Sequence, residues 1–390
     1  MLEVFLVGLI AFCFFAFNPQ TNYYLPKYWF LQQIVICLLS YNVYLIGGLP
    51  FSLLIFYALS SVNYFTSLQF NHFFLRNPTL TVDFSGKVRH TFIASLALVI
   101  VYLFIGEHPI KLFIEASPLL LLIGTVYPLL PDKLRRMSIY RGVHVPFKKP
   151  PYDSRTHLTC AYFGYGSNPS VASSFLSVLA PVTLFTLEIS DFYFYFTITT
   201  LILTFIAMVT MKASSGLGAF IASMLTFIAY KVGLTATLIS IPCLIVSLYL
   251  INKYYFKGKL FDLSGRDDII KFAWKHMKLR KVSMWIGHGV GSFAYLMPKL
   301  QRLKKSDLDT KGRHFAWAHC DFFQFFLEGG VIGAVLLALF MGHSLYLGYD
   351  NPAFMAFFVA WCCNSTTNFV NYLAPDSTIC ILMIKYLHVS

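Results

Sequence analysis

The residues best suited to chemistry lie together, in a stretch that runs from His319 to Gly333. It reads His-Cys-Asp-Phe-Phe-Gln, followed by Glu-Gly-Gly-Val-Ile-Gly. Histidine titrates near neutral pH, so it can accept or donate a proton during a reaction. Because ionisable side chains are expensive where a polar loop enters an apolar segment, they indicate function there. His319 is therefore a candidate functional residue, with Asp321, Gln324 and Glu328 as polar neighbours. The alternative is a histidine that only forms hydrogen bonds at the start of a helix.

A second pattern begins at Ser264-Gly265-Arg266 and continues, after Trp274, with Gly287-His-Gly-Val-Gly-Ser-Phe293. An arginine binds phosphate through charge-assisted, often bidentate hydrogen bonds. Gly287, Gly289 and Gly291 lack a Cβ, so this loop permits close backbone approach, and its N–H groups can face an anion. The alternative is a flexible surface turn. A dinucleotide-binding fingerprint is not expected, because no strand–turn–helix unit surrounds these glycines.

Two shorter patterns precede apolar segments. The first, Gly166-Ser-Asn168-Pro-Ser-Val-Ala172, is typical of a helix that starts after an Asn-Pro turn with a serine cap. The second, Lys212-Ala-Ser-Ser-Gly216, is typical of a tight turn of small residues. Lys212 offers a second cation beside this turn.

The elements that must position these residues are membrane helices. The chain has 390 residues, of which 57% are hydrophobic and only 12% charged, where soluble domains are about 25% charged. The apolar segments are continuous rather than alternating, so they predict helices and not a barrel. We therefore expect an all-α, polytopic integral membrane protein that forms a single membrane domain over 1–390. About twelve transmembrane helices are expected near 2–17, 29–46, 50–68, 91–106, 109–130, 171–190, 192–211, 215–231, 233–251, 322–347, 353–372 and 376–388.

Two connections are long, a basic loop at 131–170 and a large polar loop at 252–321, between the ninth and tenth expected spans. All four patterns then lie on one membrane face. That face also carries all but three of the 30 Lys and Arg, the exceptions being Lys111, Lys231 and Lys385. The positive-inside rule would place this face in the cytoplasm, although a site for anionic phosphate would also concentrate bases on one face. With a net charge of +13 arranged between apolar segments, lipid head groups or anionic lipid-linked substrates are better partners than nucleic acid.

In this order and on this face, the four patterns resemble those of the O-antigen ligase and O-antigen polymerase superfamily, polytopic glycosyltransferases of the GT-C type. The similarity is clear over 160–350. It is closest in the Ser-Gly-Arg and Gly-x-Gly-x-Gly-Ser-Phe segments and in the His-x-Asp-x-x-Gln and Glu-x-Gly-x-x-Gly segments. Two positions depart from the family pattern: Ser215 replaces an arginine, and Cys320 replaces an asparagine.

The resemblance implies transfer of a glycan from a polyprenyl-diphosphate-linked oligosaccharide to an acceptor hydroxyl, on a lipid A-core or another glycan. Arg266 and Lys212 would bind the diphosphate, and His319 would accept the proton of the acceptor hydroxyl or orient the acceptor. The residues that would shape the site are Gly287, Gly289, Gly291, Asn168, Asp321, Gln324 and Glu328. The family needs no metal or other cofactor, and the chain has no Asp-rich motif of the kind that holds Mg²⁺. The family orientation places the active site on the periplasmic side of a bacterial inner membrane.

Other functions stay open at this stage. A polymerase of the same family differs only in its acceptor, and the pattern through Glu328 favours the ligase. A polysaccharide or lipid transporter would be favoured by intramembrane charges and internal repeats, but the expected spans hold few charges and no repeat is evident. A non-catalytic membrane scaffold is the third possibility.

Overall fold

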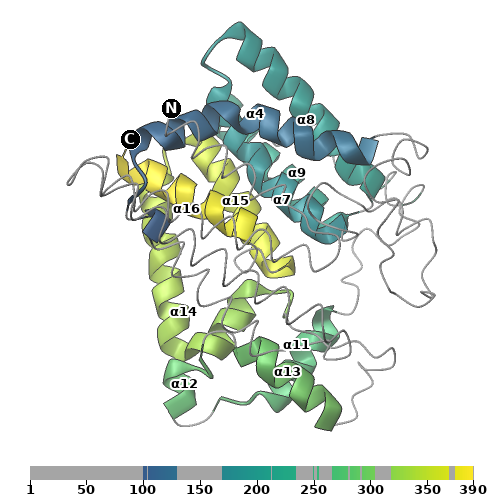
Figure 1. The fold of residues 1–390 in the computed structure, drawn as a ribbon, viewed down its shortest axis with the longest axis vertical. Coiled ribbons are helices and arrows are strands. Elements are labelled where there is room, and N and C mark those ends of the chain that lie inside the picture. Colours follow the sequence, from purple (N-terminus) through teal and green to yellow (C-terminus); the bar gives the residue numbers. More distant parts are fainter. Residues whose placement is uncertain are drawn as a thin grey trace, which may run out of the picture.

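The computed structural model describes residues 100–102, 104–129, 169–211, 213–233, 249, 253, 266–279, 282–289, 292–303, 318–368 and 374–389. Within these ranges the regular structure is entirely helical, with no strand (Figure 1). The all-α class is thus confirmed for this part of the chain. The predicted segments 2–17, 29–46 and 50–68, most of 91–106 and almost all of 233–251 lie outside the described residues.

The remaining predicted segments coincide with helices to within a few residues, except where 171–190 and 353–372 end early. The apolar helices are α4 (Glu107–Leu129), α7 (Pro169–Thr183) with the short 3-10 helix η2 (Leu184–Thr186), α8 (Asp191–Met211), α9 (Ser214–Val232), α14 (Asp321–Gly348), α15 (Pro352–Thr367) and α16 (Ala374–Val389). Among the described helices, α4, α8, α9 and α14 are long and apolar enough to cross a membrane. The count of twelve spans stays a prediction.

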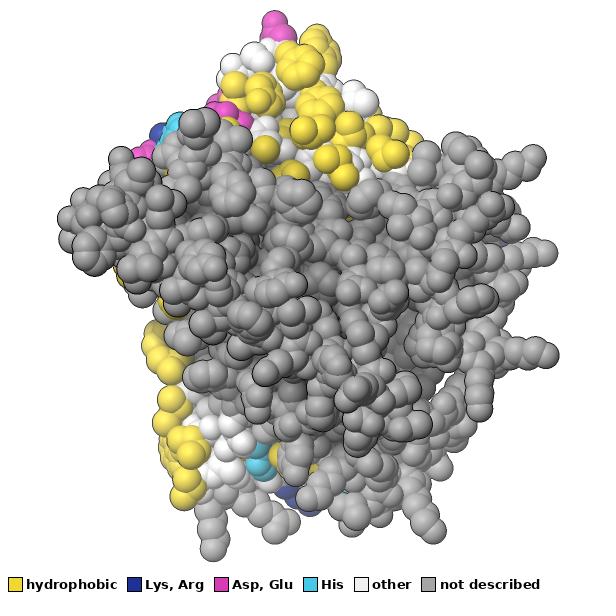
Figure 2. All heavy atoms as spheres, viewed as in Figure 1, with side chains coloured by type: hydrophobic (Ala, Val, Ile, Leu, Met, Phe, Trp, Pro, Cys, Tyr) yellow, Lys and Arg dark blue, Asp and Glu magenta, His cyan; other side chains and the backbone are white. Residues whose placement is uncertain are grey.

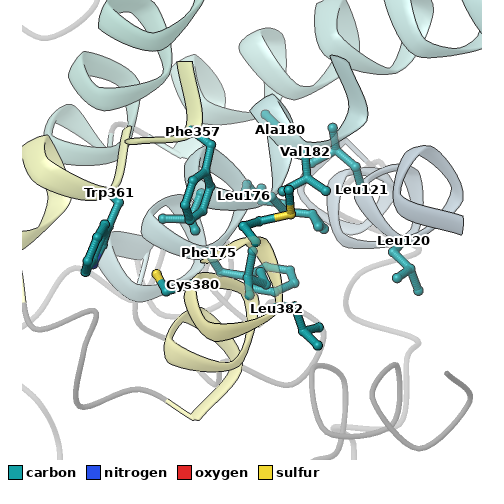
Figure 3. Packing of buried hydrophobic residues seen from close by; sticks show 14 of the residues in the cluster. Leu120, Leu121, Phe175, Leu176, Ala180, Val182, Phe357, Trp361, Cys380 and Leu382 are labelled. Atoms are coloured by element: carbon teal, nitrogen blue, oxygen red, sulfur yellow. The ribbon is translucent and has the colours of Figure 1, made fainter. Parts of the chain in front are cut away.

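Six of these helices, α4, α7, α8, α9, α15 and α16, pack into one bundle (Figure 1). Its centre is lined by large side chains with no exposed surface, among them Phe113, Phe175 and Phe357. Figure 3 shows α4, α7, α15 and α16 each contributing to this core. The second half of α14 runs along one side of the bundle.

Helix α8 has the reverse of the polarity expected in water. Its buried side carries Thr197, Thr200 and Thr204, whereas Ile198 and Ile202 are exposed. The hidden hydroxyls are satisfied internally: Thr204 Oγ1 lies 3.0 Å from Thr125 Oγ1 of α4, and Thr197 Oγ1 lies 2.8 Å from Thr186 Oγ1. Small polar residues between helices and aliphatic residues outside are typical of helices packed in lipid.

Helix α14 is exposed in the same way. Ile332, Val335, Leu336 and Leu339 are each about half exposed or more. Figure 2 shows hydrophobic side chains along the left edge, over α14, and at the top, over α4 and α8. A soluble monomer rarely exposes apolar surface on this scale. The exposed faces of α8 and α14 therefore indicate a helical membrane protein.

A polar seam joins α7, α9 and α15 inside the bundle. Asn364 of α15 donates from Nδ2 to Ser177 Oγ (2.8 Å) and accepts at Oδ1 from Ser174 Oγ (3.2 Å). One turn before Ser177 on α7, Ser173 meets Gly216 of α9, which lies so close that a Cβ on it would be 2.5 Å from Ser173 Cβ. The small residues of the predicted turn therefore permit close helix packing.

This contact yields a prediction. Gly216→Ala should destabilise the protein by about 1–3 kcal/mol, because the added methyl must push α7 and α9 apart. Gly218→Ala is the matched control, since a Cβ there meets nothing within 4 Å and alanine favours a helix. Thermal unfolding of the purified protein in detergent compares the two variants. Equal midpoints would contradict the close approach of these helices.

Candidate active site

The large polar loop predicted over 252–321 contains three helices that the sequence analysis did not anticipate: α11 (Arg266–His276), α12 (Val282–Ile286) and α13 (Ser292–Leu303). Ile269 and Ala273 of α11, Phe293 and Met297 of α13, and Leu327 of α14 form a small buried cluster. This second core holds α11 and α13 against the first turns of α14 (Figure 1). It is the scaffold on which the predicted catalytic residues lie.

Helix α14 is broken at Gly330, where the backbone adopts φ 64° and ψ −159°. The first arm, up to Gly329, lies among α11, α12 and α13, and the second arm runs beside the bundle. Figure 1 shows the two arms meeting at a sharp bend near α12. The predicted tenth span, 322–347, matches the outer limits of α14 but is not one continuous helix.

The glycine-rich loop closes this break. The last carbonyls of any helical segment lack partners within the helix. Here the backbone N–H of His288 donates to Leu327 O (3.0 Å), and that of Gly289 donates to Glu328 O (2.9 Å). We call these two hydrogen bonds the backbone clasp.

The clasp explains why both Gly287 in the loop and Gly330 in α14 are glycines. A Cβ on Gly287 would collide with the Glu328 carbonyl, and a Cβ on Gly330 would lie 2.5 Å from Trp285 O. Both glycines also have positive φ, which other residues adopt rarely. Since the N–H groups of His288 and Gly289 are used in the clasp, they do not face an anion. That expectation for this loop is wrong for these two residues.

Gln324 and Glu328 position neighbouring backbone from one face of the first arm. Glu328 Oε1 accepts from Phe293 N (3.1 Å) and from Gln324 Nε2 (3.1 Å). Gln324 Oε1 accepts from Ala318 N (3.0 Å). All these bonds are buried, so the pair ties the start of α13 to the residue that precedes His319.

His319 lies two residues before α14 in the left-handed backbone region, with φ 55°. It is the one described non-glycine residue with a positive φ, a conformation that histidine tolerates better than most residues. The hydrogen bond that Ala318 makes to Gln324 holds one side of this turn. On the other side, Cys320 O accepts from Gln324 N (3.0 Å). The side chain is thus presented from a constrained turn.

Arg266, the first residue of α11, lies close enough to His319 for its charge to act on the imidazole. Burial, and then the Arg266 charge, lower the pKa of His319 to about 4. The ring is therefore neutral at neutral pH and can accept a proton. Burial also lowers the pKa of the half-buried Arg266 guanidinium, which nevertheless stays charged because arginine titrates far above neutrality.

Arg266 has no carboxylate within ion-pairing distance among the described residues. The aspartates that follow it do not neutralise it: Asp267 pairs with Lys271 at 3.1 Å, and Asp268 is exposed on the same helix. A half-buried cation without an acidic partner has lost hydration that an anion could replace. The geometry thus combines a cation ready for an anionic ligand with a neutral base.

Two further contacts join helix ends in the described part of the chain. Asp321, in the first turn of α14, and Asp376, in the first turn of α16, are both fully buried. Both lie close enough to Cys380 of α16 for their charges to interact with its thiol. The start of α7 meets the end of α15, because Asn368 Nδ2 donates to Ser170 O (3.1 Å). Asp376 was not singled out from the sequence, where one aspartate after a proline resembles an ordinary helix start.

Three predicted site residues, Lys212, Asn168 and Gly291, lie outside the described residues, as do residues 131–168 of the predicted basic loop 131–170. The helices that follow Asn168 and Lys212 are α7 and α9, and they touch near their starts, at Ser173 and Gly216. Among the residues that the structure describes, no three His, Cys, Asp or Glu side chains are grouped to hold a metal ion. Compared with protein-family models and with curated proteins, the chain matches neither a family model nor a curated sequence.

The clasp can be tested with two adjacent glycines. Gly330→Ala should loosen the 282–303 segment, because alanine is strained at this φ and its methyl would meet the Trp285 backbone. We expect faster limited proteolysis within this segment and a loss of stability of about 1–3 kcal/mol. Gly329→Ala, whose Cβ would meet nothing within 4 Å, should leave proteolysis unchanged. Equal cleavage rates for both variants would contradict the clasp.

Proposed function

We propose that this protein transfers a glycan from a polyprenyl-diphosphate carrier to an acceptor hydroxyl, as the resemblance to O-antigen ligases implies. The observation that carries the proposal is the proximity of a cation, Arg266, to a neutral base, His319. A half-buried guanidinium without a carboxylate partner among the described residues lies within electrostatic range of a neutral imidazole. Transfer from a diphosphate needs both groups, a cation for the leaving group and a base for the nucleophile.

Transfer first requires that the negative charge on the departing diphosphate be stabilised. When the bond between the anomeric carbon and the diphosphate oxygen breaks, the electron pair stays with the polyprenyl diphosphate. A preorganised cation stabilises this developing charge most effectively where water is excluded. Arg266 is half buried, and its planar guanidinium can bind two phosphate oxygens at once. Lys212 is proposed as a second cation.

The acceptor hydroxyl supplies the new bond. Its oxygen attacks the anomeric carbon opposite the diphosphate, and its proton passes to a ring nitrogen of His319. One displacement inverts the anomeric centre. The products are the glycosylated acceptor and free polyprenyl diphosphate, so the step needs no nucleotide.

The charge of the bound donor is expected to change the pKa of His319. In the free protein the Arg266 charge contributes to the low pKa of His319. A diphosphate bound to Arg266 would offset that charge and raise the pKa of His319. Since general bases work best when their pKa lies near the working pH, His319 would become a better base when the donor is in place.

The membrane supports a lipid-linked donor. The polyprenyl chain requires an apolar surface beside the site, and the second arm of α14, which begins at Gly330, carries an exposed aliphatic face. We propose twelve spans and a site that faces the periplasm of a bacterial inner membrane. The basic residues of the loops would then meet diphosphate and anionic saccharide.

We propose a ligase rather than a polymerase, so that the acceptor is a lipid A-core. This choice rests on the resemblance of the segment through Glu328. In the structure Gln324 and Glu328 hold the backbone beside His319, which suits a positioning role for both.

The test is rescue of a gene deletion in the native host, with surface glycolipids separated on a gel. His319→Ala should lower transfer by about 10²–10⁴-fold, the usual contribution of a general base. Arg266→Gln should lower it by about 10²–10³-fold, as for other electrostatic donors. Both variants should leave the lipid core without its ladder while lipid-linked glycan accumulates.

Lys271→Gln is the matched control, because Lys271 lies on α11 with Arg266 but is exposed and paired with Asp267. It should restore the full ladder. A core that carries a single repeat in the deletion strain would indicate a polymerase. Full rescue by His319→Ala, at normal expression, would refute the proposed mechanism.

A further inference from the structure

Helix α12 presents an apolar surface that nothing described in the chain covers. Val282, Met284, Trp285 and Ile286 are all about half exposed or more, with Trp285 at 59%. Fully burying one such side chain is worth about 1.5–3 kcal/mol. The helix contributes no side chain to the buried cluster that holds α11 and α13. Its apolar residues therefore do not serve the packing of the loop itself.

The position of α12 relative to α14 indicates what covers it. The backbone clasp holds α12 against Gly330, where the second arm of α14 begins. That arm, residues 331–348, is about 27 Å long at ~1.5 Å per residue, close to the ~30 Å hydrocarbon core of a bilayer. If this arm crosses the membrane, Gly330 lies at one edge of the hydrocarbon, and α12 lies at the same level.

The residues in and around α12 are of the types found at the edge of the hydrocarbon core. Tryptophan is enriched where the hydrocarbon meets the head groups. Lys275 and Lys278 are exposed before α12, and Arg280 and Lys281 directly precede it in the sequence. Basic side chains beside an apolar segment suit the phosphates of lipid head groups. Trp274, 61% exposed, stacks on Phe326 one turn before Gly330.

We propose that α12 is an interfacial anchor that inserts Met284, Trp285 and Ile286 into the head-group and upper acyl region of the surrounding bilayer. The anchor would hold the backbone clasp, and through it the loop that carries Arg266, at the membrane surface. This inference does not depend on the proposed transfer reaction.

The test uses tryptophan fluorescence of the full-length protein in phosphatidylcholine vesicles. Some vesicles contain lipid that is brominated near the head group, which quenches a tryptophan at that depth. The signal of Trp285 is the difference between the wild type and Trp285→Phe. Trp361→Phe is the matched control, because Trp361 is only 3% exposed within the bundle.

We expect brominated lipid to remove most of the Trp285 signal and little of the Trp361 signal, while the aqueous quencher iodide leaves Trp285 largely unaffected. Quenching of Trp285 by iodide and not by brominated lipid would place α12 in water and overturn the proposal. Quenching by neither would mean that protein, such as a second copy of the chain, covers α12, and would overturn it as well. Both variants must first elute as the wild type does on gel filtration; if Trp285→Phe does not, Ile286→Trp in the wild-type background provides the signal.

Discussion

The arrangement of the site depends on the backbone clasp, the two hydrogen bonds by which His288 and Gly289 complete the broken end of the first arm of α14. Without them, two carbonyls would be left without partners at the Gly330 break. The clasp turns a long apolar helix into two arms with separate roles. One arm runs along the bundle with an exposed apolar face, and the other anchors the loop helices. Gln324 and Glu328 extend from the first arm to hold the chain around His319.

The clasp and the first arm of α14 hold the segments that carry Arg266 and His319, and the charge of Arg266 acts on the imidazole of His319. Keeping Arg266 half buried, without a carboxylate partner among the described residues, costs hydration energy that the fold must supply elsewhere. The same charge contributes to the neutral state of His319. An anion bound to Arg266 would replace the lost hydration of the guanidinium and would also offset its charge, so that the pKa of His319 rises. A site that is unfavourable when empty and improved by a diphosphate is well suited to a reaction in which a diphosphate leaves.

For the described part of the chain, the sequence predicted the helical class and the limits of most apolar helices, because a continuous hydrophobic segment indicates a helix that is apolar on all sides. It also singled out His319 and Arg266, which lie within electrostatic range of each other in the structure. It did not reveal the break at Gly330, since Gly329 and Gly330 both fit a helix that packs closely. Helices α11 to α13 were missed because their short amphipathic patterns lie among many charges. The role of Gly287 depends on a contact with residues about 40 positions away, which no local pattern contains.

The most direct measurement is turnover by the purified protein in lipid nanodiscs, supplied with a polyprenyl-diphosphate oligosaccharide and an acceptor glycolipid, in the presence of EDTA. The account predicts glycosylated acceptor and free polyprenyl diphosphate in equal amounts, with inverted anomeric configuration. Movement of intact donor across the bilayer without any bond broken would contradict it. That result would identify a transporter.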